Sequence, residues 1–264
     1  MARKIQLITI EGNIGSGKST LLENVCKHYL NDSRVIFLKE PVSEWETIKD
    51  ANGVTMLQKF YTDQKKYSFP FQMMAYITRL VLLKTSIEEN PNATVFFTER
   101  SLYTDKHVFA KMLYDTGNIE DVNYQIYMRW FDAFSKDFTI SNVIYVKTDP
   151  EICHHRIHMR SREGEDIIPL EYLQNCHKYH ETLVFDHFAN VKTLLIDGNA
   201  DIRRNPDIIE QWIHEIEQLL LRTPLDTASE VQSLFAALAP AVQSLKKTLE
   251  LSHPPTTTSS KLLS

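Results

Sequence analysis

Residues 5–20 read IQLITIEGNIGSGKST, and this stretch decides the fold. The apolar residues from Ile5 to Ile10 predict a buried parallel strand. The segment from Gly12 to Ser19 matches the phosphate-loop pattern G-x-x-x-x-G-K-[ST] at every fixed position. A helical pattern follows, and its apolar face is made of Leu21, Leu22, Val25 and Cys26. Strand, loop and helix in this order predict a binding site for nucleotide phosphates.

The chemistry of phosphate binding explains the residue types in this loop. Glycines allow backbone N–H groups to turn toward phosphate oxygens, and the helix N-terminus adds positive potential. We expect Lys18 to reach the β- and γ-phosphates and the Ser19 hydroxyl to ligate Mg²⁺, so ATP and Mg²⁺ are the predicted cofactors. The predicted contacts are Gly12, Asn13, Ile14, Gly15, Ser16, Gly17, Lys18, Ser19 and Thr20. The alternative, a chance match in a glycine-rich turn, is disfavoured by the flanking strand and helix.

Length, charge and cysteine content limit the class of protein. A chain of 264 residues suffices for one large α/β domain with a tail. The net charge of −5 argues against nucleic acid as a partner, and no apolar run reaches transmembrane length. Cys26, Cys153 and Cys176 show no metal or redox spacing, which indicates a reducing compartment. Because the N-terminus leads straight into the first strand, we expect a cytoplasmic protein without membrane association.

Four further apolar, β-branched runs occur along the chain, each followed by polar residues and a helical pattern. They are Val35–Leu38, Thr94–Phe97, Val143–Val146 and Val191–Ile196. This alternation predicts an α/β fold of three layers, in which helices flank a five-stranded parallel sheet. We also predict that residues 43–90 are helical and that residues 162–168 form a mobile loop between two helices. Ligands of such sheets bind at the carboxyl ends of the strands.

Charged residues follow the predicted strands at these ends. Glu40 comes after the second strand, where a carboxylate can orient an acceptor hydroxyl and take its proton. Glu99 and Arg100 come after the third strand. Glu99 can share Mg²⁺ with Ser19, and Arg100 can offset the charge that develops during phosphoryl transfer. The alternatives are a solvated glutamate in a turn for Glu40 and a surface ion pair for the other two.

A third polar cluster contains Arg156, Arg160 and Arg162. Arg156 and Arg160 are four residues apart, so they share one helix face and repel each other unless an anion lies between them. The cluster leads into the predicted loop, which suits an arginine lid over a nucleotide. The alternative is a solvated basic face. His154 and His158 also have metal-ligand spacing, but no third ligand is evident, and we expect them on the helix surface.

At this point the chain resembles the cellular deoxynucleoside kinases, the family that includes deoxycytidine, deoxyguanosine and deoxyadenosine kinases. The resemblance runs from Ile5 to about Leu221. Its landmarks are EGNIGSGKST (11–20), EPVSEW (40–45), LQKFY (57–61), SFPFQ (68–72), TERSLYTDKHVFAK (98–111), HRIHMRSRE (155–163) and IPLEYL (168–173). It implies a P-loop nucleoside kinase fold with an arginine lid, a kinase domain over residues 1–222 and a homodimer.

The resemblance also implies roles for individual residues. Glu40 would activate the 5′-hydroxyl of the deoxyribose with Arg100 beside it, while Arg156, Arg160 and Arg162 would surround the transferring phosphate. The remaining substrate contacts would be Tyr61 and Glu165 (or Glu163) on the 3′-hydroxyl, Gln72 on the base edge, and Trp45, Leu57, Phe60, Phe71 and Phe109 as pocket walls. Asp201 and Ile202, in IDGNADI (196–202), would lie against the adenine of ATP. By spacing alone, the pocket walls could equally be core residues.

Arg79 and Asp105 bear on the choice of base. In the resembled family this pair marks enzymes for deoxycytidine and purine deoxynucleosides. A carboxylate can accept from an exocyclic amino group, which thymine lacks, and arginine can donate to base acceptors. The alternative is an ion pair between the two without base contact. Tyr67 and Ser161 depart from residues found in many relatives, which leaves the base preference open.

The C-terminal extension, residues 223–264, contains no strand pattern. Its apolar stripe is interrupted by Pro240 and predicts two short helices, formed from Val231, Phe235, Leu238, Val242, Leu245 and Leu249. Residues 252–264 are rich in Pro, Thr and Ser, which predicts disorder. The helices could pack on the domain or contact a protein partner.

The sequence therefore predicts an ATP- and Mg²⁺-dependent deoxynucleoside kinase that prefers deoxyguanosine, deoxyadenosine or deoxycytidine to thymidine. One alternative is a nucleoside monophosphate kinase of the thymidylate type, which would need a further arginine clamp for the acceptor phosphate. Another is a catalytically silent nucleotide-binding module that acts through the tail. The presence of Glu40, Glu99 and Arg100 together argues against the silent module.

Overall fold

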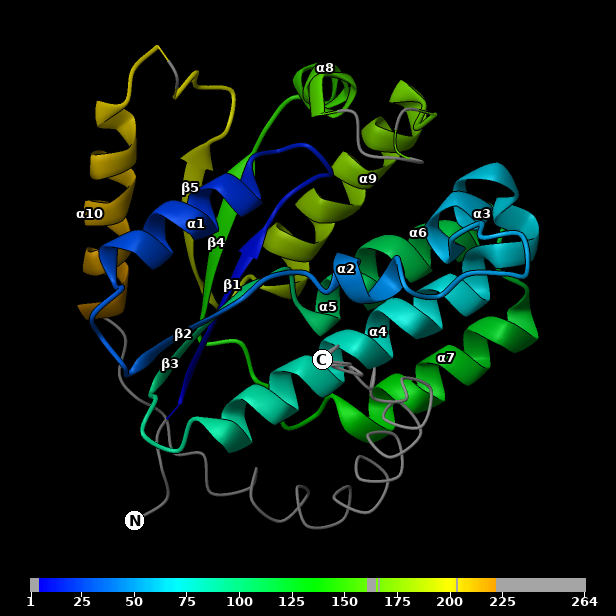
Figure 1. The fold of residues 1–264 in the computed structure, drawn as a ribbon, viewed down its shortest axis with the longest axis horizontal. Helices are drawn as coiled ribbons and strands as arrows, with labels where there is room; N and C mark the ends of the chain where they lie inside the picture. Colours follow the sequence, from blue (N-terminus) through cyan, green and yellow to red (C-terminus); the bar gives the residue numbers. More distant parts are fainter. Residues whose placement is uncertain (1–4, 161–164, 166, 203, 222–264) are drawn as a thin grey trace, which may run out of the picture.

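The computed structural model describes residues 5–160, 165, 167–202 and 204–221. Within them, five parallel strands form one sheet in the order β2-β3-β1-β4-β5. The strands are β1 (Gln6–Glu11), β2 (Val35–Leu38), β3 (Val95–Glu99), β4 (Asn142–Lys147) and β5 (Lys192–Asp197). The predicted five-stranded parallel sheet is confirmed, and every predicted strand overlaps an observed one (Figure 1).

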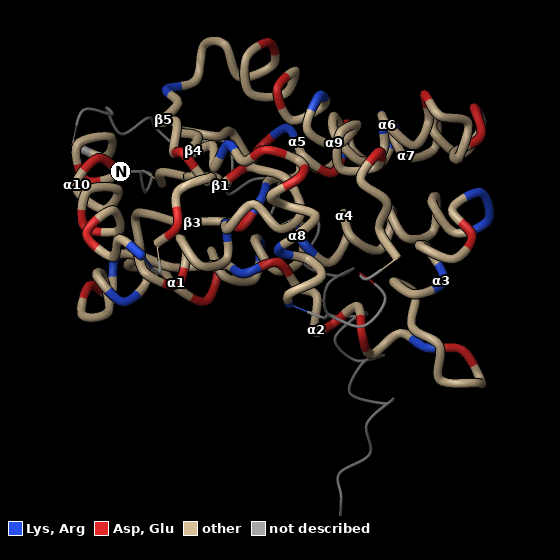
Figure 2. Tube along the Cα trace, turned by 90° about the horizontal axis from the view of Figure 1, so that it is seen from above, with Lys and Arg blue, Asp and Glu red and all other residues tan. Residues whose placement is uncertain are grey.

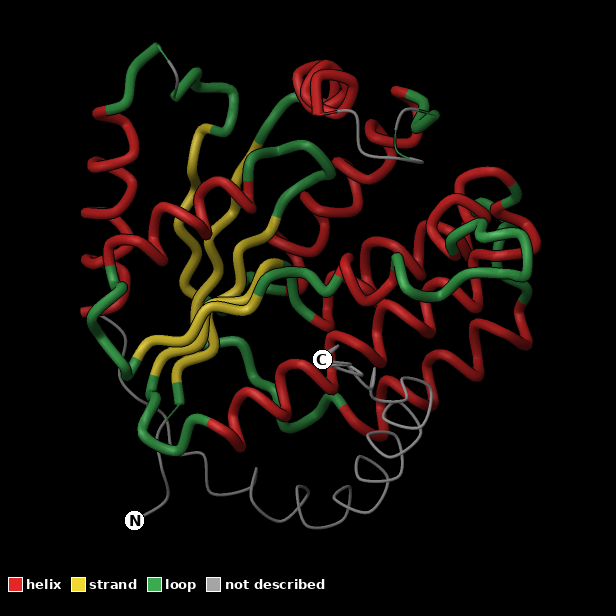
Figure 3. The backbone as a smooth tube through the Cα atoms, in the orientation of Figure 1, coloured by secondary structure: helices red, strands yellow, loops and turns green. Residues whose placement is uncertain are grey.

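Helices cover both faces of the sheet, which gives the three predicted layers (Figures 1 and 3). The helices α1 (Lys18–His28) and α10 (Asp207–Leu221) pack on the face that carries Ile8 and Ile10. The opposite face carries Leu7 and is covered by the larger helical layer, which includes α4 (Gln64–Glu89), α7 (Asp121–Phe134) and α9 (Leu170–Thr182). Successive side chains of a strand point to opposite faces, so β1 contributes to both apolar cores.

Beyond these, the described chain contains further helical segments, some of which directly follow the carboxyl ends of strands. They are α2 (Val42–Trp45), α3 (Met56–Thr62), α5 (Leu102–Thr104), η1 (Asp105–Ala110), α6 (Lys111–Asp115), α8 (Pro150–Arg160) and η2 (Leu183–His187), where η marks a π-helical segment. In the view onto these ends, acidic and basic positions lie close together between α1, α8 and α2 (Figure 2). Among the described residues, no helix combines the length and apolar character that crossing a membrane requires.

The prediction of continuous helix over residues 43–90 is wrong for residues 46–55. This segment is a loop with an antiparallel bridge between Lys49 and Thr55. The Asp50 carboxylate accepts from the N–H groups of Asn52 and Val54, at 2.9 and 3.0 Å. Aspartate side chains that bind nearby backbone N–H groups favour turns over helix. Thr55 then starts α3 with a capping box.

The predicted arginine lid and tail are described only in part. Arg160 and Glu165 belong to the described residues, whereas Arg162 and Glu163 do not. The C-terminal extension from residue 223 also lies outside them, so the predicted helices and disorder of the tail stay predictions.

Candidate active site

A cavity of about 1210 Å³ opens at the carboxyl ends of the strands. Ligand pockets commonly measure about 300–1,000 Å³, so this cavity has room for more than one small ligand. The structure brings most of the predicted site residues to its wall: Ile14, Gly15, Ser16, Gly17, Lys18, Ser19, Thr20, Glu40, Trp45, Leu57, Phe60, Tyr61, Phe71, Gln72, Glu99, Arg100, Asp105, Phe109, Arg156, Arg160, Glu165, Asp201 and Ile202. Gly12, Asn13 and Arg79 do not line it.

The phosphate loop needs glycine where it passes other backbone. Gly12 and Gly15 have φ values of 146° and 78°. A Cβ atom at Gly12 would lie 2.6 Å from the Val146 carbonyl oxygen, and one at Gly15 would lie 2.6 Å from that of Cys153. Asn13 lies at the base of the loop, where its side-chain amide donates to the Leu173 carbonyl of α9 at 2.8 Å. Gly12 and Asn13 therefore shape the loop from behind its ligand-facing side.

Lys18 is held at the floor of the cavity. Its side chain is buried, and Nζ donates to the Asn13 carbonyl oxygen at 2.5 Å. Burial and, to a smaller extent, nearby Arg100 lower the pKa of Lys18 to about 7, against the opposing effect of Glu99 and Glu40. A phosphate group beside Nζ would favour the ammonium form, because an opposite charge stabilises the charged state.

We therefore predict that ATP binding is coupled to proton uptake by Lys18. Calorimetric titrations at pH 8 in buffers of different ionisation enthalpy should show uptake that approaches one proton, because free Lys18, with a pKa of about 7, is mostly neutral there. At pH 6 the uptake should nearly vanish. Lys18→Arg is the control, since a guanidinium stays charged at both pH values. Equal uptake by the wild type and this variant at pH 8 would contradict the prediction.

Ser19 and Glu99 form the part of the wall that could hold a divalent cation. The Ser19 hydroxyl donates to Oε1 of Glu99 at 2.5 Å, so the two predicted ligands are adjacent. Mg²⁺ prefers oxygen ligands and is commonly bound by one or two protein groups together with substrate phosphates. The residues therefore fit the ion. His154 and His158 lie on α8 with ring centroids 4.3 Å apart and ring planes tilted by 58°. The described residues contain no group of three or more His, Cys, Asp or Glu that could hold a metal ion.

Glu40 lies between two arginines. Arg100 Nη1 is 2.7 Å from both carboxylate oxygens, and Arg79 Nη2 is 2.8 Å from Oε1. Burial alone would raise the pKa of Glu40, but Arg100, Arg79 and Lys18 outweigh it and lower the pKa to about 2. The carboxylate is thus ionised throughout the physiological pH range. It can accept a hydrogen bond from a hydroxyl group and orient its oxygen toward the phosphate loop.

Arg100 has a strained backbone, with a φ of 64°. A non-glycine residue in this region costs about 1–3 kcal/mol and persists only where its surroundings fix it. The Arg100 N–H donates to the Ile10 carbonyl at 3.0 Å, and the guanidinium lies 5.1 Å from the centre of the Phe109 ring. These contacts direct the buried side chain toward Glu40.

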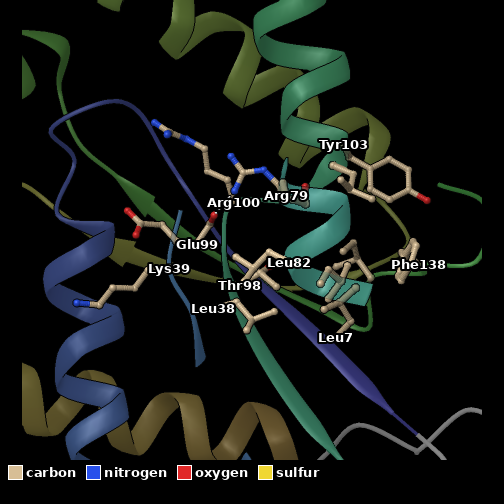
Figure 4. A pocket seen from close by; sticks show the side chains of 14 residues that line it. Leu7, Leu38, Lys39, Arg79, Leu82, Thr98, Glu99, Arg100, Tyr103 and Phe138 are labelled. Carbon is tan, nitrogen blue, oxygen red and sulfur yellow. Dashed lines mark hydrogen bonds between the residues drawn. The ribbon is translucent and has the colours of Figure 1, made fainter. Parts of the chain in front are cut away.

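Arg79 lies behind the main cavity and does not line it. Its Nε donates to Asp105 at 2.9 Å, Nη1 to the Glu99 carbonyl at 2.7 Å and Nη2 to Glu40. Arg79 lines a second cavity of about 20 Å³, where Figure 4 shows Arg79 and Arg100 at the polar end and Leu7 and Phe138 at the apolar end. Arg79 and Asp105 thus form the ion pair that was the alternative, and the expected contact of Arg79 with a base stays a prediction.

Asp105 lines the main cavity from η1. Burial raises the pKa of its carboxyl group to about 6, although Arg79 acts in the opposite direction. Asp105 can present a hydrogen-bond acceptor to a ligand while Arg79 holds it from behind.

The far end of the cavity is aromatic. Phe60 and Phe71 stack with ring centroids 4.5 Å apart, and Trp45 meets Phe71 edge-on at 5.7 Å. Gln72 is 2% exposed, and its Oε1 has no hydrogen-bond partner within the described structure. A buried polar atom without a partner is costly, so this amide suits a ligand that donates a hydrogen bond between the rings.

Tyr61, Tyr172 and Glu165 close one side of the aromatic end. The two tyrosine rings meet edge-on at 6.2 Å, and burial raises the pKa of both. Glu165 pairs with Arg160 from α8. Tyr172 was not predicted as a site residue, although it belongs to the quoted segment IPLEYL; its only local signal is its place in the first turn of α9.

The end of the cavity opposite the aromatic residues is formed by the phosphate loop, α8 and the segment after β5. Arg156 Nη1 donates to the carbonyl oxygens of Ser16 and Gly198, at 3.2 and 2.8 Å, so it joins this segment to the phosphate loop. Trp212 of α10 also lines this end. The amphipathic pattern of α10 gave no signal that could separate Trp212 from the core residues of that helix.

A phosphate loop, an ionised carboxylate between arginines and an aromatic pocket share one cavity, and this combination defines a phosphate-transferring enzyme. Residues 8–221 match the family model described as deoxynucleoside kinase. The chain is 32% identical over 244 residues to deoxycytidine kinase of Homo sapiens, which covers 82% of this chain and 92% of that protein.

Two further relatives give the same result. A probable deoxycytidine kinase of fowlpox virus is 35% identical over 201 residues, which covers 74% of this chain and 79% of that protein. Mitochondrial thymidine kinase 2 of Homo sapiens is 30% identical over 220 residues, which covers 82% of this chain and 74% of that protein. The chain belongs to the deoxynucleoside kinase family, and it is an enzyme that phosphorylates deoxynucleosides.

Proposed function

We propose that this kinase transfers the γ-phosphoryl group of ATP, with Mg²⁺, to the 5′-hydroxyl of deoxycytidine or a purine deoxynucleoside in preference to thymidine. The observation that carries the proposal is the position of Glu40. Its ionised carboxylate lines the same cavity as Lys18 at the phosphate loop and Gln72 between the aromatic rings. A nucleoside that binds at the aromatic end would direct its sugar toward Glu40 and its hydroxyl toward the phosphate.

The residues would divide the reaction as follows. Lys18 and the amides of the phosphate loop bind the donor phosphates, and Glu40 orients the 5′-hydroxyl and accepts its proton. Arg100, Arg156 and Arg160, together with Arg162, balance the charge on the migrating group. Mg²⁺, held by Ser19 and Glu99, would neutralise phosphate charge. Phosphoryl transfer passes through a loose transition state, in which the 5′-hydroxyl loses its proton late. A carboxylate with a pKa of about 2, such as Glu40, can therefore still act as the base.

The base preference would come from the polar groups at the aromatic end. Gln72 can both donate and accept, whereas ionised Asp105 only accepts. An exocyclic amino group would satisfy Asp105, and thymine carries none. A site built for a donor rejects a base that lacks it, because its buried acceptor is then left unpaired.

We predict that Asp105→Asn lowers kcat/KM for deoxycytidine by about 10- to 100-fold and lowers that for thymidine much less, because an amide can donate to a base carbonyl. Steady-state kinetics with both substrates would measure the ratio. Asp132→Asn is a matched control on the exposed surface of α7, where the side chain pairs with Lys106. The prediction fails if the two kcat/KM values fall by the same factor.

The direct test compares the four natural deoxynucleosides and dTMP as acceptors with ATP and Mg²⁺. We expect turnover of deoxycytidine or a purine deoxynucleoside ahead of thymidine and none of dTMP. Turnover of dTMP alone would identify a monophosphate kinase instead. Binding of ATP without turnover of any acceptor would identify a silent module.

The assembly and location of the enzyme are part of the proposal. We propose a homodimer, supported by the exposed Val122, Ile126 and Trp130, which lie four residues apart along α7. Sedimentation velocity of the full chain would test it. We further propose a kinase domain over residues 1–222, with an extension over residues 223–264 that is available for protein contacts. A cytoplasmic location is supported by the free thiols of the three cysteines.

A further inference from the structure

Glu11 is a buried carboxylate that the proposed reaction does not use. It is the last residue of β1 and is 0% exposed. The Thr9 hydroxyl donates to its Oε1 at 2.7 Å, and the Thr104 hydroxyl donates to its Oε2 at 2.5 Å. Within the described part of the chain, no lysine or arginine forms an ion pair with Glu11. Two hydroxyl groups from separate segments therefore satisfy this carboxylate.

The partner Thr104 belongs to the short helix α5. Its N–H donates to the Ser101 hydroxyl at 3.2 Å, and the Ser101 N–H donates back to the Thr104 hydroxyl at 3.2 Å. These two bonds form a capping box that closes the turn 101–104. The Thr104 hydroxyl thus accepts a hydrogen bond within its own turn and donates one to the Glu11 carboxylate at the end of β1.

This turn lies between two residues of the active site. Arg100 precedes it and has the strained backbone conformation described above, with its N–H bonded to the Ile10 carbonyl. Asp105 follows it and lines the cavity. The last two residues of β1 consequently hold the segment 100–105 at two points, one through backbone and one through the Glu11 side chain.

Stability alone does not explain an acidic group at this position. Burying a carboxylate without a cationic partner is unfavourable, and a well-packed apolar side chain of similar volume is often neutral or more stabilising. The residue after Glu11 is Gly12, where the phosphate loop begins. A rigid bond from Glu11 to Thr104 therefore fixes the distance between the phosphate loop and the segment that carries Arg100 and Asp105.

We propose that Glu11 is a positioning residue: through Thr104 it holds Arg100 and Asp105 in register with the phosphate loop, so that acceptor and donor meet in line. The proposal rests on the proposed function only in that deoxynucleoside turnover is the activity measured in its test. A displacement of about 1 Å at a reacting centre can lower the rate about 10²-fold, so a single buried hydrogen bond suffices for a large effect.

The test compares Thr104→Val, which removes the hydroxyl and keeps the branched shape, with Thr104→Ser, which keeps the hydroxyl. With deoxycytidine or the preferred acceptor, Thr104→Val should lower kcat about 10- to 100-fold, and Thr104→Ser should stay within about threefold of the wild type. KM for ATP should stay within about twofold in both, because the phosphate loop binds ATP through its own amides and Lys18. A general loss of structure would instead raise KM for ATP and lower Tm together.

A double-mutant cycle with Glu11→Leu identifies the bond, because leucine has no hydrogen-bond acceptor, whereas glutamine would keep one. The double variant Glu11→Leu/Thr104→Val should lose about as much activity as the more damaging single variant, because both changes remove the same interaction. Should Thr104→Val fail to fold, Thr104→Ala removes the same hydroxyl with a smaller side chain and should lower kcat in the same way.

Three results would overturn the proposal: near-full kcat in Thr104→Val, multiplying losses in the cycle, or a KM for ATP that rises in proportion to the loss. A wild-type protein that phosphorylates no deoxynucleoside would refute the proposed function instead, and the two failures are thus distinguishable.

Discussion

Glu40→Gln should lower kcat by about 10²- to 10⁴-fold, the usual effect of removing a positioned base. The amide keeps the shape of the side chain but cannot accept the proton of the 5′-hydroxyl. Arg79 and Arg100 both donate to carboxylate oxygens of Glu40, and in the variant one of these oxygens is replaced by an NH₂ group, which cannot accept. Nucleoside binding should change little, because the base is held at the aromatic end. Steady-state kinetics gives kcat, and calorimetry gives the dissociation constant of the nucleoside.

Glu44→Gln provides the matched control for this experiment. Glu44 lies in α2, four residues from Glu40, and its side chain is exposed and outside the cavity wall. This variant should keep the activity of the wild type. Near-full kcat in Glu40→Gln would show that Glu40 is not the group that activates the hydroxyl.

Arg79→Met should lower the free energy of unfolding by about 3–5 kcal/mol, the range measured when one partner of a buried ion pair is removed. The variant leaves Asp105 without its ion-pair partner and takes one of two cations from Glu40, while the Asp105 carboxylate stays buried and the Glu40 side chain is only 13% exposed. Urea denaturation at pH 7.5 measures the change. Turnover should fall as well, because the repulsion between the two carboxylates is no longer compensated.

Arg34→Met is the control for stability. Arg34 pairs with Asp32 at 2.7 Å, but its side chain is 70% exposed, and surface pairs of this kind contribute little. The variant should unfold at nearly the same urea concentration as the wild type. If Arg79→Met also unfolds at that concentration, the buried network around Glu40 does not contribute to stability as we infer.

The sheet could be predicted because its signals are local. Each strand is a short apolar run bounded by polar residues, and the phosphate loop is defined by glycines that no other residue could replace at Gly12 and Gly15. The loop over residues 46–55 was missed, although Asp50 and Gly53 are turn residues, because helices flank it on both sides and hydrogen bonds of the Asp50 carboxylate fix the turn.

The candidate site was predictable only to the level of which residues gather in one cavity. The hydrogen bonds of Arg79 depend on acceptors from two distant segments, Glu40 after β2 and Glu99 with Asp105 at the end of β3 and beyond. No spacing rule encodes such a convergence. The same holds for Glu11 and Thr104, which are 93 residues apart. Chains of this family share the motifs, but the partner of each polar atom is a property of the packed structure.

Helix α4 carries Phe71 and Gln72 at the aromatic end of the cavity and Arg79 two turns further along. The helix has no proline or glycine between Gln72 and Arg79, the residues at which helices usually kink, so a displacement at one would be passed to the other. A bulky base that pushes α4 outward would therefore also pull Arg79 away from Glu40. The turnover number would then fall as the nucleobase becomes larger, and poorly fitting analogues would bind and yet react slowly.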